Sequence, residues 1–153
     1  MFASGPLVLA LVLVTGTAAA NEVLSDLSFR DSTGGTHQLK ALTDAGRSMV
    51  FVFWQPWCTS CAREAPALVK AAKDYKKRLQ FFGVVSGKDE FVDDTRVDRF
   101  IGKYSIPYPL VRDRDLSLTE GMTVEGTPTI IIVGKGNQVL YRGHRAPKDW
   151  TKF

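Results

Sequence analysis

The sequence predicts an α/β domain, because short apolar runs of strand length alternate with longer segments of helical periodicity. Its 153 residues, 44% hydrophobic and 24% charged, match a single packed core rather than two. The formal net charge of +4 is mild, and no basic stripe with interleaved aromatic residues is present. We therefore expect one domain with no nucleic-acid partner.

The first twenty residues are expected to be a targeting segment. Residues 6–14 form an apolar run, and small residues follow it up to Ala20. This order is typical of a secretory signal peptide cleaved after Ala20. The run is shorter than the roughly 20 apolar residues of a spanning helix, so cleavage is favoured and an uncleaved membrane anchor is the alternative. Residues 21–153 would then form a domain in the periplasm or on the extracytoplasmic face.

Two strand signals open the domain. Residues 23–29 and 36–39 flank the turn-forming segment 31–35, which predicts a β-hairpin. The apolar run 48–53 follows and is typical of a buried central strand.

Helices and strands then alternate to the end of the chain. A helix is predicted after the cysteines, to about Arg78, because apolar residues recur there at helical spacing with lysines on the opposite side. The further elements expected are a strand at 81–85, a helix at 91–104, a short strand at 108–111, a helical turn or two at 116–122, a hairpin of strands 129–133 and 138–142, and the start of a helix at 145–150.

The chemistry is expected at Cys58 and Cys61, the only two cysteines, which follow directly on the apolar run 49–54. A strand that delivers a Cys-x-x-Cys pair to the first turn of a helix places the first thiol among unpaired backbone N–H groups, which stabilise its thiolate. Cys58 is thus the expected nucleophile. Cys61 lies on the same helical face and is placed to resolve a mixed disulfide formed at Cys58. The spacing predicts a redox-active disulfide.

Two other uses of the cysteine pair remain open. A structural disulfide is common in exported proteins, but a bridge across two residues constrains the unfolded chain little. A zinc site needs two more ligands, and only His37 and His144 are available. Neither histidine has a motif around it. Both are therefore expected on the solvated surface, and no metal is expected.

Three motifs together identify a family resemblance. The motifs are Phe53-Trp54-x-x-Trp57-Cys58-x-x-Cys61 with Glu64 and Pro66 following, Gly126-Thr127-Pro128 before a strand, and the N-terminal hairpin with its Asp-x-x-Gly turn. Over roughly residues 23–143 the chain resembles exported thioredoxin-fold thiol-disulfide oxidoreductases of the TlpA/ResA type. The resemblance implies a thioredoxin-like three-layer fold with a central mixed β-sheet and an added N-terminal β-hairpin.

The resemblance also implies roles around the cysteines. Pro66 would kink the first long helix, and Pro128 would be a cis proline facing the disulfide. Thr127 would pair through its backbone with an extended client segment; the alternative is an ordinary extended residue before proline. Trp57 flanks the dithiol, either as an exposed wall for client peptides or as part of the core, whereas Trp54 is expected to pack.

Glu64 is the candidate proton carrier. It lies one helical turn beyond Cys61, where partial burial would favour its protonated form and let it exchange protons with that thiol. The alternative from position alone is a surface carboxylate placed for the helix dipole. In the TlpA/ResA type, a glutamate at this spacing belongs to the active site.

The expected reaction is dithiol–disulfide exchange by a monomer with no cofactor besides the disulfide. By resemblance, the chain would reduce protein disulfides outside the cytoplasm, with clients such as apocytochrome c and a membrane protein as electron donor. An oxidant of the DsbA kind would run the exchange in the opposite direction. A binding module with an inert disulfide is a further alternative.

Two other classes fit less well. A peroxiredoxin needs a threonine three residues before its reactive cysteine, where this chain has Gln55. A copper chaperone of the Sco kind uses a Cys-x-x-x-Cys spacing, which is one residue longer than the spacing here.

Overall fold

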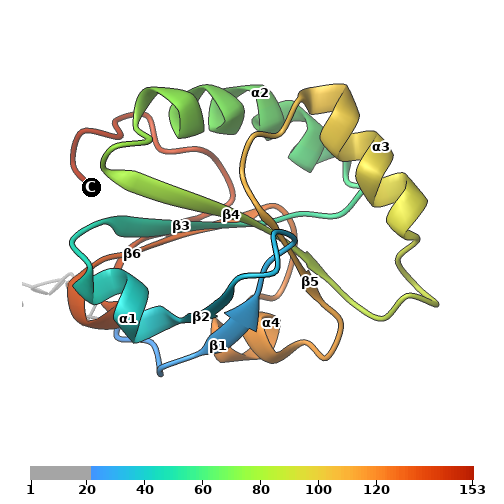
Figure 1. The fold of residues 1–153 in the computed structure, drawn as a ribbon. Coiled ribbons are helices and arrows are strands. Elements are labelled where there is room, and N and C mark those ends of the chain that lie inside the picture. Colours follow the sequence, from blue (N-terminus) through green and yellow to red (C-terminus); the bar gives the residue numbers. More distant parts are fainter. Residues whose placement is uncertain (1–21) are drawn as a thin grey trace, which may run out of the picture.

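A computed structural model describes residues 22–153 (Figure 1). The predicted signal peptide or anchor at residues 1–20 lies outside the described residues. Within residues 22–153, no helix combines the length and the apolar character that crossing a membrane requires.

The centre of the fold is a five-stranded mixed sheet with the order β5-β4-β3-β6-β7. Its strands are β3 (Ser48–Phe53), β4 (Leu79–Ser86), β5 (Leu110–Asp113), β6 (Thr129–Val133) and β7 (Val139–Gly143). β4 runs parallel to β3 and β5, whereas β6 runs antiparallel to β3 and β7. The middle strand β3 is a continuous apolar run because both of its faces are covered.

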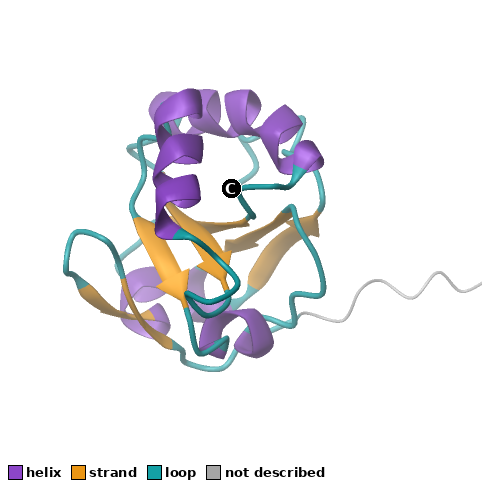
Figure 2. Ribbon diagram, turned by 90° about the vertical axis from the view of Figure 1, so that its right-hand side faces the viewer, coloured by secondary structure: helices purple, strands orange, loops and turns teal. Residues whose placement is uncertain are grey.

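Helices cover both faces of this sheet (Figures 1 and 2). One face carries α2 (Thr59–Asp74) and α3 (Asp94–Tyr104); the other carries α1 (Leu39–Asp44), α4 (Ser117–Gly121) and the hairpin. Neighbouring strand residues divide between two cores, since side chains alternate across a strand. Phe81 packs in the core with Trp54 and Phe100, whereas Phe82 packs in the other core with Phe51. The predicted three-layer, thioredoxin-like fold is confirmed.

The N-terminal hairpin consists of β1 (Ser28–Arg30) and β2 (Thr36–Gln38), paired antiparallel as predicted. Its turn is organised by the buried carboxylate of Asp31, which accepts hydrogen bonds from the backbone N–H groups of Thr33 and Gly35 at 2.8 and 3.2 Å. The second Asp31 oxygen lies 2.7 Å from Nε2 of His37.

The expectation that His37 is solvated is wrong. Its side chain is only 20% exposed, and its ring lies 5.1 Å from the ring of Phe29 and 5.4 Å from that of Phe82. The contact with Asp31 holds the His37 ring against the hairpin's apolar side. The imidazole can be partly buried there because its nitrogen has a polar partner.

Two predicted helix ends also need correction. The helix after the cysteines ends at Asp74 rather than near Arg78, because Leu79 enters β4 opposite Ser48. The next helix begins at Asp94 rather than residue 91, because the side chain of Asp93 caps it by accepting from the N–H of Thr95 at 2.8 Å.

The helix expected at residues 145–150 is absent. This stretch has an irregular backbone instead. The backbone N–H of Ala146 is bound by the Glu64 carboxylate instead of by a helical carbonyl, and Pro147 follows. Trp150 anchors the segment, 7% exposed, with its ring 5.5 Å from that of Phe81.

Candidate active site

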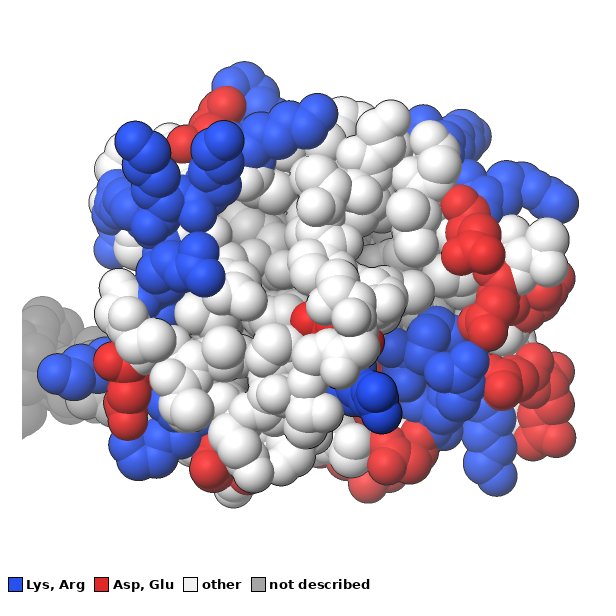
Figure 3. All heavy atoms as spheres, viewed as in Figure 1, with Lys and Arg blue, Asp and Glu red and all other residues white. Residues whose placement is uncertain are grey.

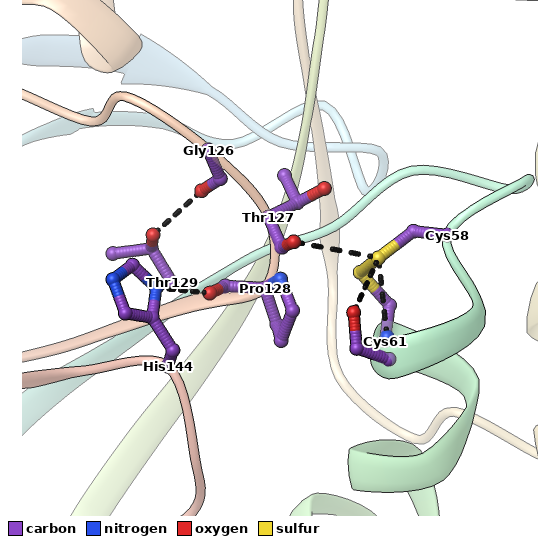
Figure 4. The surroundings of a disulfide bond; sticks show 8 residues. Cys58, Cys61, Gly126, Thr127, Pro128, Thr129 and His144 are labelled. Atoms are coloured by element: carbon purple, nitrogen blue, oxygen red, sulfur yellow. Dashed lines mark hydrogen bonds between the residues drawn. A yellow bond between two sulfur atoms is a disulfide. The ribbon is translucent and has the colours of Figure 1, made fainter.

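The cysteine pair lies where β3 gives way to α2. Cys58 is the N-cap of α2, with an extended backbone, and its Sγ accepts a hydrogen bond from the N–H of Cys61 at 3.1 Å. Cysteine thus takes the place of the usual hydroxyl or carboxylate cap. Because helix N-termini favour negative charge, a thiolate at Cys58 would be stabilised there. Cys58 and Cys61 form a disulfide (Figure 4).

The two sulfur-bearing residues differ in exposure. Cys61 is 3% exposed and packs in the core between the sheet and α2, while Cys58 is half-buried at its edge. A partner from solvent therefore meets Cys58 first.

The segment before β6 faces the disulfide, as Figure 4 shows. The peptide bond between Thr127 and Pro128 is cis, which confirms the expectation from the resemblance. The carbonyl oxygen of Thr127 lies 3.6 Å from Cys58 Sγ. Thr129 stabilises the turn, because its hydroxyl donates to the carbonyl of Gly126 at 2.6 Å. The structure thus brings together two motifs that are far apart in the sequence.

Glu64 lies on α2, half-buried, one turn beyond Cys61. Its carboxylate accepts the backbone N–H of Ala146 at 2.8 Å, and in this oxidised state no hydrogen bond joins it to Cys61 within residues 22–153. Tyr141 lies close by and donates its hydroxyl to the carbonyl of Arg145 at 2.7 Å. Burial, assisted by the Glu64 charge, raises the pKa of Tyr141. Glu64 therefore holds the C-terminal segment near the site.

The two tryptophans of the motif differ in exposure. Trp54 is 2% exposed and stacks on Phe100 at 4.4 Å, as expected for a packing residue. Trp57 is 50% exposed beside Cys58, and the guanidinium of Arg96 lies 5.8 Å from its ring centroid. Trp57 is therefore exposed beside the disulfide rather than part of the core.

Among residues 22–153, no cluster of three or more His, Cys, Asp or Glu side chains is arranged to hold a metal ion.

The family follows from the sequence match. The family model described as Redoxin matches residues 18–151. The chain belongs to the Redoxin family. Together with the thioredoxin-like fold, this confirms at family level the resemblance drawn from the motifs.

Individual relatives are more distant. The chain is 27% identical over 126 residues to "Thiol-disulfide oxidoreductase ResA" of Halalkalibacterium halodurans, covering 82% of this chain and 65% of that protein. The chain thus spans slightly less than two thirds of that relative's length.

Solved structures resemble the fold. The thioredoxin domain of a thiol-disulfide oxidoreductase from Bacteroides vulgatus has a TM-score of 0.68 at 20% identity, covering 84% of this chain and 90% of that one. A secreted Mycobacterium tuberculosis disulfide oxidoreductase homologous to E. coli DsbE has a TM-score of 0.64 at 21% identity, covering 80% and 85%.

Two contacts in this Redoxin-family site come from Ser60 and His144, which were not predicted to lie there. The Ser60 hydroxyl lies 3.6 Å from Cys58 Sγ. His144, expected in solvent, is exposed, but its Nδ1 lies 2.8 Å from the carbonyl oxygen of Pro128. The predicted hairpin could have indicated the contact of His144, because Ile130 of β6 pairs with Gly143 of β7. This pairing places the next residue, His144, beside the start of β6.

Proposed function

We propose that this chain is a thiol-disulfide oxidoreductase that acts through Cys58 and Cys61. The observation that carries the proposal is the arrangement of the disulfide itself. Its half-exposed sulfur caps a helix N-terminus and faces the Thr127-Pro128 segment, while its partner sulfur is buried. A purely structural bridge would need neither the helix N-terminus nor the open approach to one sulfur. The named activity of the ResA relative supports the same reaction.

The reaction proceeds by two exchanges. The Cys58 thiolate attacks one sulfur of a client disulfide, forms a mixed disulfide and releases the other client sulfur as a thiolate, which takes up a proton. Cys61 then loses its proton, attacks Cys58 Sγ and releases the second client thiolate. Two electrons pass to the client, whose disulfide becomes two thiols, while Cys58 and Cys61 become a disulfide. No bound cofactor takes part.

Glu64 is proposed as the proton carrier for Cys61. It is half-buried and one helical turn away, and its present hydrogen bond to Ala146 uses one carboxylate oxygen. General acid–base groups of this kind contribute roughly 10²- to 10⁴-fold in rate. Glu64 also binds the C-terminal segment at Ala146, so a test must separate this structural role from proton transfer.

Thr127, Pro128 and Trp57 are proposed to bind the client. Thr127 presents its carbonyl 3.6 Å from Cys58 Sγ, which suits an extended client segment that adds alongside it by backbone hydrogen bonds. Trp57, half exposed beside the same sulfur, offers a flat apolar surface.

We infer that the direction is reduction, outside the cytoplasm. Residues 1–20 would direct export as a cleaved signal peptide or hold the chain as an anchor, and residues 21–153 would act as a monomer. Protein disulfides, for example in apocytochrome c, would be the clients. A membrane protein that offers a dithiol would return the electrons to Cys58 and Cys61.

The activity is tested by reduction of insulin disulfides with dithiothreitol as the final reductant. Wild-type protein should accelerate the reaction well above dithiothreitol alone, and Cys58→Ala should not. A wild-type rate equal to the rate with dithiothreitol alone would contradict the proposal and favour an inert disulfide.

Export is tested by expressing the full chain in a Gram-negative host. A periplasmic product whose mass begins at Asn21 supports cleavage. A product of full mass in the membrane fraction supports the anchor, and a full-length cytosolic product would overturn both.

A further inference from the structure

A groove runs beside the reactive sulfur, between the cysteine motif and α3. Its volume is about 360 Å³. Its walls are formed by the motif on one side and by one face of α3 on the other. The lining residues are Pro56, Trp57, Cys58, Thr59, Ala62, Arg96, Arg99, Phe100, Lys103 and Tyr104. Because Cys58 is part of the wall, a client bonded to that sulfur lies at the groove's mouth.

The groove is positively charged. Arg96, Arg99 and Lys103 recur at spacings of three and four, so they project from one face of α3. All three are exposed, and within residues 22–153 none of them forms an ion pair and no Asp or Glu lines the groove.

The acidic residues of α3 do not neutralise this row of cations. Asp94, at the start of α3, binds Arg112 and Arg114 on β5 and beyond it. Asp98 is not among the lining residues, because it lies roughly opposite the three cations around the helix. Elsewhere some lysines are paired with acids, as in Lys70 with Asp74, but others, such as Lys73 and Lys76 on and just after α2, form no ion pair within residues 22–153 (Figure 3 shows the charges on one face). The row on α3 differs from these other cations because it lines a groove whose wall includes Cys58.

The dimensions suit a stretch of polypeptide. From Arg96 to Lys103 the helix rises about 10 Å at roughly 1.5 Å per residue, which is the length of about three extended residues. Thr127 and Pro128 do not line the groove. A client strand laid along Thr127 thus leaves the groove free for the residues on the other side of its cysteine.

We infer that this groove docks an acidic polypeptide segment next to the reacting cysteine of a client protein. The inference rests on the proposed function, because it names the client surface for that exchange. Arginine binds carboxylates bidentately, so Arg96 and Arg99 would hold Asp or Glu side chains, with Lys103 completing the row. Trp57, under Arg96, would pack against the apolar parts of the same segment.

The experiment compares three synthetic peptides of equal length, each with one internal Cys-x-x-Cys disulfide. Their flanking residues are acidic, neutral or basic. Second-order rate constants for their reduction by the reduced protein are measured by acid quench and chromatography. Each is divided by the rate constant with dithiothreitol, which corrects for the intrinsic reactivity of the peptide disulfide.

The acidic peptide should react at least about tenfold faster than the basic one at low ionic strength, within the range of electrostatic steering. Salt at about 0.5 M should bring the ratio near one, since screening then acts within a few ångströms. The triple variant Arg96→Gln, Arg99→Gln, Lys103→Gln should lose most of the ratio. This ratio is independent of any change in Cys58 reactivity, because both peptides meet the same thiolate.

A matched control removes three exposed cations elsewhere, with Lys73→Gln, Lys76→Gln and Lys77→Gln. It should keep the wild-type ratio. A wild-type ratio of one or below would overturn the docking inference. An equal loss of the ratio in both triple variants would overturn it as well. Failure to reduce even the neutral peptide would instead overturn the proposed function.

Discussion

At the residue scale, the difference in exposure between Cys58 and Cys61 assigns their order of reaction. Cys61→Ser should leave Cys58 able to attack but unable to be released, so mixed disulfides with client proteins accumulate. Cys58→Ser should abolish exchange and trap nothing, because Cys61 is 3% exposed. Non-reducing electrophoresis and mass spectrometry of the adducts make the measurement. Trapping by Cys58→Ser and not by Cys61→Ser would reverse the two roles.

Glu64→Gln separates proton transfer from the anchoring of Ala146. The amide keeps an oxygen that can accept from the Ala146 N–H, but it cannot carry a proton. The exchange rate should therefore fall about tenfold or more and change its pH dependence, while the melting temperature stays near that of the wild type. Glu64→Ala, as the control, should lower both. An exchange rate for Glu64→Gln equal to that of the wild type at every pH would leave Glu64 with the anchoring role alone.

Sequence patterns found the residues whose chemistry is local. The Cys-x-x-Cys spacing indicated the disulfide, and the resemblance indicated the cis bond at Pro128. Ser60 and His144 escaped because their contacts depend on side-chain direction and on strand register, which no motif records.

At the element scale, the hairpin turn depends on the ionised carboxylate of Asp31. Burial opposes ionisation, but hydrogen bonds from Thr33, His37 and Gly35 outweigh it and lower the pKa of Asp31. A lowered pKa in the folded state adds stability above the unfolded value of about 3.9, and this stability is lost as the pH falls through the folded value.

Asp31→Asn should therefore cost about 1 kcal/mol of unfolding free energy near pH 7, and the difference from the wild type should shrink below about pH 4. Urea unfolding over a range of pH makes the comparison. Asp98→Asn, which removes an exposed acid, is the control. A difference that stays constant down to pH 3 would show that the charge of Asp31 is unimportant to the turn.

In β4, Gly83 provides the space in which Trp54 lies. A Cβ there would come within 3.0 Å of Trp54 Nε1 and 3.3 Å of the Tyr108 ring, and stacking on Phe100 prevents the indole from yielding. Gly83→Ala should lower the free energy of unfolding by about 1–3 kcal/mol. The control Gly102→Ala meets nothing within 4 Å in α3 and should be neutral or stabilising. Equal stability of the two variants, measured in urea, would contradict this packing argument.

Element types were predictable, and their ends were less so. Short apolar runs located the strands of the sheet, and helical periodicity located α2, α3 and α4, but α1 was missed because its six residues carry too little periodicity. The early end of α2 reflects the pairing of Leu79 with Ser48, which is a tertiary preference that overrides a helical pattern.

At the scale of the whole molecule, strand register builds the site. Phe53 at the end of β3 pairs with Thr129 at the start of β6, so the chain just beyond one strand meets the chain just before the other. This register carries Cys58 to within contact of the Thr127 carbonyl, sixty-nine positions along the sequence. Composition and periodicity predicted an α/β domain, but the three layers and the mixed sheet came only with the family resemblance.

The conformation of the C-terminal segment depends on long-range contacts. The pattern of residues 145–150 suggested a helix. Trp150 instead packs in the core between the sheet and α2, and the Glu64 carboxylate binds the N–H of Ala146. Such contacts join residues about eighty positions apart and leave no signal in a short window of sequence.

The reduction potential of the Cys58–Cys61 pair tests the central claim most directly. Mature protein is equilibrated against glutathione or dithiothreitol buffers, and the fraction of disulfide is measured after acid quench. A reductant of protein disulfides should have a potential at or below about −230 mV. A potential near −120 mV would instead make the chain a disulfide donor and contradict the proposed direction of electron flow.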